Sequence, residues 1–287
     1  MIEVINVLRG KIMQIASKFT HVNGLKTHYH EEGSGDEKIV FIHGSGPGVS
    51  AYANWRLVIP KVKDYVHVFA PDVVGFGKTE KVAKERYTLD LWVNHLIAFI
   101  EDVCKEPVHL VGNSFGGAMA LHITNRRPDL VKKLILMGSV GIKHPLSDGL
   151  DKVWGYEPSL ESMRELIELF SYDDEAAKDE ELVKIRYEAS MEEQSREAFK
   201  AMFFEDRQKR LDELSLDKEA LKAIDKKTLI FHGLQDRIIL FEDTSYRMAQ
   251  LIPNAELHVF NRCGHWTQIE KTDEFVAHLL AFIEVDS

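Results

Sequence analysis

A serine stands between two glycines in the segment GNSFG, Gly112 to Gly116. The apolar run PVHLV precedes this segment and the small-residue run GAMAL follows it, which predicts a strand, a sharp turn and a helix in that order. The pattern G-x-S-x-G in this context is that of a nucleophile elbow, in which the serine hydroxyl is lifted above the end of a sheet. A loop serine between two glycines is common by chance, but the flanking strand and helix favour Ser114 as a nucleophile.

A serine needs a general base and an orienting carboxylate to act as a nucleophile. In folds with this elbow, the partners follow in the order serine, acid, histidine. Asp236 lies just beyond the apolar run TLIFHG, in the segment TLIFHGLQD, and His265 lies in a loop after the apolar run ELHVF. Each residue alone would be interpreted as a solvated loop residue, since the chain has 13 histidines. Together with Ser114 they predict a Ser-His-Asp triad, in which Asp243 and Asp225 are weaker choices for the acid.

The stretch FIHGSGPG predicts a glycine-rich loop directly after a strand. Its glycines free backbone N–H groups near the elbow, and we expect the N–H groups of Ser45 and Phe115 to form an oxyanion hole. Gly44 and Gly46 of the same loop are expected to contact the substrate. Donors of this kind contribute about 3 kcal/mol each when they face an oxyanion in a dry site. The loop is therefore predicted to bind an alkoxide or enolate oxygen, and not a phosphate.

Short apolar runs alternate with helical stretches from residue 38 onward, which predicts an α/β fold with a mostly parallel, doubly wound sheet. The dipeptide Asn23-Gly24, between KFTHV and LKTHYHEE, predicts an antiparallel hairpin at the N-terminal edge. Residues 144–212 are charged and helical in pattern, with no candidate strand. We therefore expect a core domain of residues 1–143 and 213–287. The helical cap of residues 144–212 would follow the sixth strand and cover the carboxyl edge of the sheet, where such folds bind ligands.

The composition excludes several classes of function. A net charge of −10 over 287 residues argues against a nucleic-acid partner. It would also repel an anionic substrate, which would then need a local cation in its pocket. Cys104 and Cys263 have no metal-ligand spacing and fit a reducing cytoplasm. No apolar run has the length of a membrane span, and the first residues lack the pattern of a signal peptide. We expect a cytoplasmic homo-oligomer with no metal and no membrane partner.

Several segments extend the pattern well beyond G-x-S-x-G. They are HGSGPGVSAYANW, APDVVGFGKT, HLVGNSFGGAMAL, LMGSVG, WGYEPS and HVFNRCGHWTQIE. Together they resemble the meta-cleavage product hydrolases, which are carbon–carbon bond hydrolases of the α/β-hydrolase fold in the bacterial degradation of aromatic compounds. The resemblance runs from about Phe19 to the C-terminus.

The resemblance implies a small anionic dienoate substrate of the 2-hydroxy-6-oxo-hexa-2,4-dienoate type, and no cofactor or metal. In the family's reaction the dienol ketonises at C5, C6 is then attacked, and the C5–C6 bond breaks. The products are 2-hydroxypenta-2,4-dienoate and a carboxylic acid. By position, Ser114, Asp236 and His265 match the family's triad. The segments WGYEPS and ANW are similar to the subgroup that accepts hydrogen, methyl or isopropyl at C6, such as 2-hydroxymuconic semialdehyde hydrolase.

The resemblance also implies four substrate-binding residues. Asn54 and Asn113 match asparagines near the dienoate, Arg186 matches the arginine that meets its charged end, and Trp266 matches a tryptophan packed against its chain. From the residues alone, other interpretations stay open. Arg186 lies among glutamates and would suit an exposed helix face with surface ion pairs. Trp266 would suit core packing, Asn54 a helix cap and Asn113 a turn.

Two other functions stay open at this point. A general carboxylesterase would use the same triad, and a small-molecule receptor would bind a ligand with little or no turnover. A haloalkane dehalogenase or an epoxide hydrolase would need a carboxylate in place of Ser114, and both are excluded on that ground.

Overall fold

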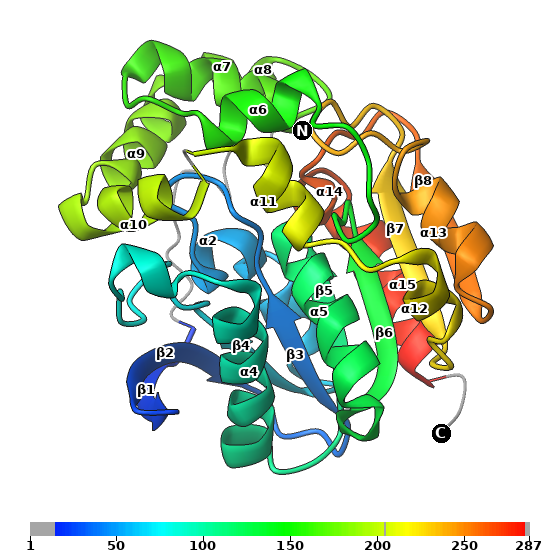
Figure 1. Ribbon diagram of the computed structural model, residues 1–287. Coiled ribbons are helices and arrows are strands. Elements are labelled where there is room, and N and C mark those ends of the chain that lie inside the picture. Colours follow the sequence, from blue (N-terminus) through cyan, green and yellow to red (C-terminus); the bar gives the residue numbers. More distant parts are fainter. Residues whose placement is uncertain (1–14, 204, 285–287) are drawn as a thin grey trace.

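An eight-stranded sheet runs through the described residues, which are 15–203 and 205–284 of this computed structural model (Figure 1). The strands lie in the order β1-β2-β4-β3-β5-β6-β7-β8. The pairs from β4 through β8 are parallel, whereas β1 pairs with β2, and β2 with β4, in antiparallel orientation. The predicted sheet is therefore confirmed. The strands are β1 (Ser17–Val22), β2 (Leu25–Glu32), β3 (Lys38–Ile42), β4 (His67–Pro71), β5 (Val108–Asn113), β6 (Val131–Met137), β7 (Thr228–Gly233) and β8 (Ala255–Phe260).

The N-terminal hairpin turns at the dipeptide that the sequence singled out. Asn23 and Gly24 both have positive φ angles, 49° and 78°. Two left-handed residues in a row suit the right-handed twist of the flanking strands, and Asn-Gly adopts that conformation at low cost. The turn therefore fixes the register, which pairs Val22 with Leu25.

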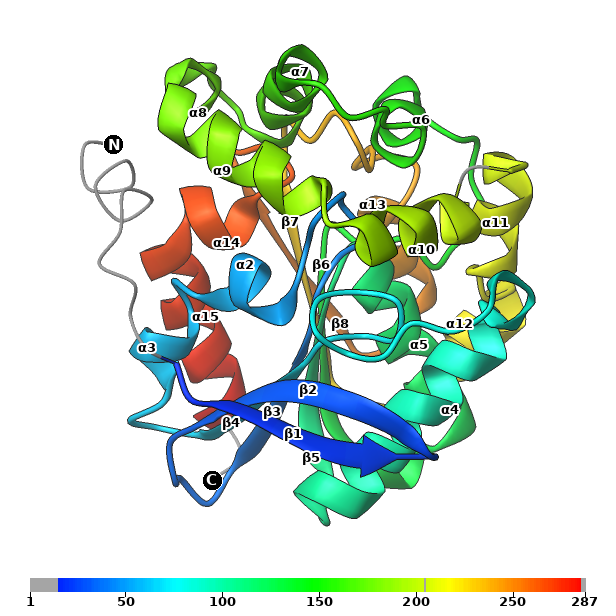
Figure 2. The same ribbon diagram turned by 90° about the vertical axis from the view of Figure 1, so that its left-hand side faces the viewer.

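Helices cover both faces of the sheet, as the view along its edge shows (Figure 2). Within the described residues, none of these helices is both long and apolar enough to cross a bilayer. One face carries α2 (Ala51–Trp55), α3 (Ile59–Val62), α14 (Thr267–Glu270) and α15 (Thr272–Glu284). The other carries α4 (Leu89–Phe99), which continues into η2 (Ile100–Cys104), together with α5 (Phe115–Arg126), α12 (Lys218–Lys222) and α13 (Ser245–Leu251). Two short turns of 3-10 helix, η1 (Lys84–Arg86) and η3 (Pro128–Leu130), lie in loops.

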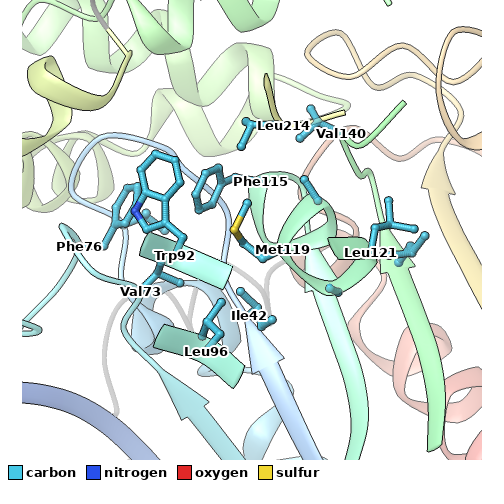
Figure 3. Close-up of a cluster of buried hydrophobic side chains, with 14 of the residues drawn as sticks. Ile42, Val73, Phe76, Trp92, Leu96, Phe115, Met119, Leu121, Val140 and Leu214 are labelled. Carbon is cyan, nitrogen blue, oxygen red and sulfur yellow. The ribbon is translucent and has the colours of Figure 1, made fainter. Parts of the chain in front are cut away.

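The core under α4 and α5 fixes the start of α5. Phe115 is fully buried, and its ring packs edge-on against Trp92 with centroids 5.0 Å apart. Phe76 and Met119 lie around the same ring (Figure 3). Because the side chain of Phe115 is held in this apolar cluster, its backbone N–H at the beginning of α5 has a fixed position.

A helical insertion follows β6 and lies over the carboxyl end of the sheet (Figure 1). Its two ends lie side by side, because Leu216 N donates to Gly141 O at 2.9 Å and Ile142 forms a bridge with Leu216. A cap after the sixth strand is therefore confirmed, while the domain limits at 144 and 212 stay a prediction. The helices are α6 (Asp148–Trp154), α7 (Leu160–Phe170), α8 (Glu175–Lys178), α9 (Glu180–Ser190), α10 (Glu193–Phe203) and α11 (Arg207–Glu213).

Candidate active site

Ser114 occupies the sharp turn between β5 and α5, and its backbone is strained. Its φ of 53° and ψ of −115° lie outside the regions that non-glycine residues normally adopt. The turn is held by the Ser114 N–H, which donates to Met137 O at 2.9 Å, and by Gly117 N, which donates to Ser114 O at 2.9 Å. A strained serine at the start of a buried helix is the geometry that the elbow pattern predicts.

The two glycines of the pattern are required by close backbone approach. A Cβ atom at Gly112 would overlap the carbonyl oxygen of Gly116, and one at Gly116 would overlap the carbonyl oxygens of Ile42 and His43. A side chain at Gly112 would push α5 away from β5, and one at Gly116 would push α5 away from the end of β3. The turn that presents Ser114 therefore depends on both glycines.

Asp236 and His265 form a buried hydrogen-bonded pair. Asp236 follows β7 and His265 follows β8, and Asp236 Oδ2 lies 2.7 Å from His265 Nδ1. The other carboxylate oxygen, Oδ1, accepts the N–H groups of Ile238 and Ile239 at 2.8 and 2.9 Å. Burial alone would raise the pKa of Asp236, but the His265 ring and its hydrogen bond hold that pKa below its usual value. Asp236 is therefore an ionised carboxylate that orients the imidazole.

Neither of the alternative acids has such a partner among the described residues. Asp225 is exposed and precedes β7, at the opposite end of that strand from Asp236. Asp243 is half-buried in the loop before α13, where its backbone carbonyl accepts Arg247. Asp236 is thus the carboxylate that reaches His265.

Ser114 and His265 line one cavity of about 40 Å³ beneath the cap. A water molecule needs roughly 10–15 Å³ of such space, so the cavity holds only a few waters. Gly138, with a φ of 49°, lies against the acid–base pair: a Cβ there would stand 3.3 Å from both Asp236 Oδ2 and His265 Nδ1. Glycine at this position therefore leaves room for the pair.

The glycine-rich loop after β3 lies beside the elbow. A Cβ added at Gly44 would stand 3.4 Å from the Cβ of Ser114, and Gly44, Ser45 and Gly46 all line the cavity. Among the described residues, neither Ser45 N–H nor Phe115 N–H donates to another protein group. Two free amides beside the serine are what an oxyanion hole requires, although their role stays a prediction.

A cap tryptophan is tied to this loop. Trp154, at the end of α6, donates its indole N–H to Ser45 Oγ at 3.0 Å. Its ring stacks on Phe203 of α10 at a centroid distance of 4.8 Å. Both contacts are buried, so the cap fixes the side chain of Ser45.

Arg186 projects from α9 into the cavity. Among the described residues it forms no ion pair; its Nη2 lies 3.5 Å from Pro47 O, and its Nε is buried without a partner. Its guanidinium carbon stands 5.8 Å from the centre of the Trp266 ring. Burial, followed by the charge of Arg56, lowers the pKa of Arg186 to about 10. The alternative of an exposed helix face with ion pairs is therefore wrong for this residue.

Trp266 is half-buried and links the loop that carries His265 to the cap. Its ring stacks on Phe170 of α7 with centroids 4.9 Å apart and planes 3° from parallel. The backbone N–H of Trp266 donates to the backbone carbonyl of Phe170 at 3.1 Å. Glu270 continues the connection, since its carboxylate accepts Tyr172 N at 2.7 Å and Gly264 N at 2.6 Å. We call this set of contacts, between residues 170–172 and 264–270, the seam.

The two predicted asparagines both line the cavity, and their positions differ. Asn54 is inside α2, where Ser50 is the N-cap, so the helix-cap alternative is wrong. Its Oδ1 accepts Gly44 N at 3.4 Å and its Nδ2 is buried without a partner. Asn113 donates its Nδ2 to Met137 O at 3.2 Å, so it also holds the turn.

Two further polar residues of the cavity were missed in the sequence. They are Arg56, which caps the end of α2, and Gln268 of α14, whose Oε1 is buried without a partner. Arg56 follows Asn54 by two residues in a segment already singled out, which is a signal that could have drawn attention to it. Gln268 has no comparable signal. Gly138 and Trp154 were also not singled out individually, although the segments LMGSVG and WGYEPS contain them.

Among the described residues, no group of three or more histidine, cysteine, aspartate or glutamate side chains could hold a metal ion. What the cavity brings together is a strained serine, a histidine paired with a carboxylate, free backbone donors and an unpaired cation. This arrangement suits acyl-transfer chemistry on an anionic carbonyl compound.

Comparison with known proteins agrees with this fold. The alpha/beta hydrolase fold family matches residues 38–272. The 2-hydroxymuconate semialdehyde hydrolase of Pseudomonas sp. (strain CF600) is 44% identical over 254 residues, which are 88% of this chain and 89% of that protein. The 2-hydroxy-6-oxo-2,4-heptadienoate hydrolase of Pseudomonas putida (strain F1) is 44% identical over 263 residues, 92% of this chain and 94% of that protein.

A solved structure gives the same result. The meta-cleavage product hydrolase CumD of Pseudomonas fluorescens IP01, complexed with acetates, has a TM-score of 0.91 and 43% identity, over 95% of this chain and 99% of that one. The fold and the elbow thus define an α/β-hydrolase. Within that fold the chain belongs to the meta-cleavage product hydrolases, as its sequence motifs predicted.

Proposed function

We propose that this protein cleaves the C5–C6 bond of a 2-hydroxy-6-oxo-hexa-2,4-dienoate, with Ser114, His265 and Asp236 as its triad. The observation that carries the proposal is Arg186, an unpaired guanidinium in the same cavity as Ser114 and His265. A planar guanidinium binds a carboxylate through two parallel hydrogen bonds. A neutral ester would leave this half-buried charge uncompensated, so an anionic substrate is favoured over an ester.

The reaction begins with ketonisation of the bound dienol at C5. His265 then takes the proton of Ser114 Oγ while that oxygen attacks the C6 carbonyl, and the N–H groups of Ser45 and Phe115 stabilise the oxyanion. When the C5–C6 bond breaks, its electron pair moves into the conjugated fragment, which takes up a proton and leaves as 2-hydroxypenta-2,4-dienoate. Water, activated by His265, hydrolyses the acyl-serine and releases the carboxylic acid.

The remaining polar residues bind the dienoate in this proposal. Asn54 and Asn113 lie beside its oxygens, the ring of Trp266 packs against its chain, and the glycine loop lies along its C6 end. The apolar lining includes Leu150 and Val153 of α6. The segments WGYEPS and ANW, which are similar to the subgroup with small C6 groups, support 2-hydroxymuconic semialdehyde or a 6-alkyl analogue as substrate.

A cytoplasmic location and a homo-oligomeric state belong to the proposal as well. Cys104 and Cys263 are both free and buried, as expected for packing thiols in a reducing compartment. Light scattering on the purified protein measures the oligomeric state directly.

The main test is to mix the purified protein with a panel of yellow ring-fission products and follow the loss of visible absorbance. We expect turnover that is fastest with hydrogen, methyl or isopropyl at C6. Ser114→Ala should abolish turnover and retain binding of the dienoate. Clear preference for p-nitrophenyl acetate would identify a carboxylesterase instead. Ligand binding with no turnover by the wild-type protein would identify a receptor.

The role of Arg186 has a matched control on the same helix. Arg186→Ala should raise the KM for the dienoate by about 10- to 100-fold, because a charge-assisted bond to the carboxylate contributes roughly 1.5–3 kcal/mol. Lys184→Ala removes the same charge from an exposed side chain of α9 and should leave the KM within about twofold. Equal effects of the two substitutions would refute a direct contact between Arg186 and the substrate.

A further inference from the structure

Arg56 places a second guanidinium on the wall of the cavity. It is half-buried at the C-terminal end of α2 and lines the same space as Ser114 and Arg186. Its Nη1 donates to the carbonyl oxygen of Ala53, one turn earlier in the helix. No carboxylate among the described residues pairs with it, so the charge of Arg56 is not neutralised within the described structure.

The two guanidinium groups act on each other across the cavity. After burial, the charge of Arg56 is the next cause that lowers the pKa of Arg186. Burial also lowers the pKa of Arg56 itself. Two like charges in a shielded space are unfavourable unless an anion lies between or beside them.

The part of the chain that the structure describes supplies no such anion to the cavity. None of the described residues that line it is an aspartate or a glutamate. The nearest catalytic carboxylate, Asp236, is already engaged by His265 and by two backbone N–H groups.

Other polar atoms of the residues that line the cavity also lack partners. Asn54 Nδ2, two residues before Arg56 on α2, is buried without a hydrogen bond, and so are Arg186 Nε and Gln268 Oε1. Buried polar groups in folded proteins are nearly always satisfied, by protein, water or ligand. Two of these atoms, Asn54 Nδ2 and Arg186 Nε, are donors, whereas Gln268 Oε1 is an acceptor. The two unpartnered donors beside two cations indicate that an anionic ligand group completes this end of the cavity.

We infer that Arg56 is a second substrate-binding residue, which shares the carboxylate end of the ligand with Arg186. The identity of that ligand as a dienoate rests on the proposed function. The presence of an anion-binding end does not, because it follows from the charges and the unpartnered atoms that line the cavity. Arg186 arrives from the cap and Arg56 from the core, so a bound carboxylate connects the two parts of the protein.

The test compares two probes of equal length on the Ser114→Ala protein, hexanoate and its neutral analogue hexanamide. Arg56→Gln should weaken hexanoate binding by at least tenfold, measured by titration calorimetry, and should weaken hexanamide binding far less. Arg56→Lys should recover part of the loss for hexanoate, because it keeps the charge and loses the planar fork. Lys61→Gln, at an exposed cation of neighbouring α3, is the control for net charge.

A structural role for Arg56, through its bond to Ala53, predicts a different result. Both probes would then bind more weakly by the same factor, the melting temperature would fall, and Arg56→Lys would not restore the selectivity for hexanoate. Equal losses for both probes, or unchanged hexanoate binding in Arg56→Gln, would overturn the inference. If Arg56→Gln shows the selective loss but the wild-type protein turns over no dienoate, the proposed function fails and the inference stands.

Discussion

Replacing Asp236 with asparagine exchanges one oxygen of the acid–base pair for an NH₂ group. Asp236 Oδ1 accepts the N–H groups of Ile238 and Ile239, at 2.8 and 2.9 Å. The amide oxygen of the asparagine must stay at that position, because an NH₂ group there would face two N–H donors. Its NH₂ group therefore points toward His265 Nδ1, which Asp236 Oδ2 contacts at 2.7 Å in the wild-type protein.

This orientation forces His265 into the wrong tautomer. Nδ1 must accept a hydrogen bond, so the ring proton moves to Nε2, which then cannot take the proton of Ser114. The corresponding exchange in serine proteases lowers kcat about 10,000-fold, a barrier increase of about 5 kcal/mol at 1.36 kcal/mol for each factor of ten. We expect a loss of that order, with little change in the melting temperature because the two backbone hydrogen bonds remain.

The assay is steady-state turnover of the dienoate at saturating concentration, followed by the loss of visible absorbance. Asp243→Asn and Asp225→Asn serve as controls, because neither side chain reaches His265 and both should keep activity within about twofold. A kcat for Asp236→Asn within tenfold of the wild-type value would refute the reasoning. An equal loss in either control would show that the acid was wrongly assigned.

Three further predictions concern residues that support the site. Gly138→Ala should lower the free energy of unfolding by about 1–2 kcal/mol, because alanine disfavours the left-handed backbone of this position. The new Cβ would also move Asp236 and His265, so kcat should fall by about 100-fold. Thermal melts measure the first effect and steady-state kinetics the second. Trp154→Phe removes the bond to Ser45 Oγ, so kcat should fall while the apolar packing on Phe203 persists. Asp72→Asn should cost about 3–5 kcal/mol, because its buried carboxylate accepts His28 Nδ1, Ala51 N and Lys78 N. Burial opposes ionisation of Asp72, but the His28 hydrogen bond leaves its pKa lowered. This stabilisation is therefore present above the pKa of about 3.9 in the unfolded chain, and it is lost as the pH falls through the pKa in the folded protein. The difference in melting temperature between the wild-type protein and Asp72→Asn should therefore disappear in acid.

Features with a local backbone cause were predictable from the sequence. Asn23-Gly24 fixes a hairpin because both residues accept positive φ angles. The glycines around Ser114 are needed because the backbone approaches itself closely within one short segment. Such signals need no knowledge of the distant chain.

Features that depend on contact between distant segments were not predictable in the same way. Arg186 lies among glutamates, and only the packing of α9 over the glycine loop shows that its guanidinium enters the cavity. Arg56 and Gln268 carry no pattern of their own, and their position beside Ser114 comes from the assembly of α2 and α14 around the sheet. The bond between Trp154 and Ser45 joins residues 109 positions apart. Only the resemblance to a family predicted Arg186 as a substrate-binding residue, whereas its neighbours in the sequence alone favoured an exposed helix face.

The seam determines how a substrate can reach so small a chamber. Residues 170–172 at the end of α7 are bonded to the loop that carries His265, through Trp266 and Glu270. Lifting that end of the cap would pull the imidazole away from Asp236 with each passage of a molecule. We therefore expect α7 to act as a fixed pivot, with α9 swinging outward around it. Entry of the dienoate would then move Arg186 and leave Ser114, His265 and Asp236 in place.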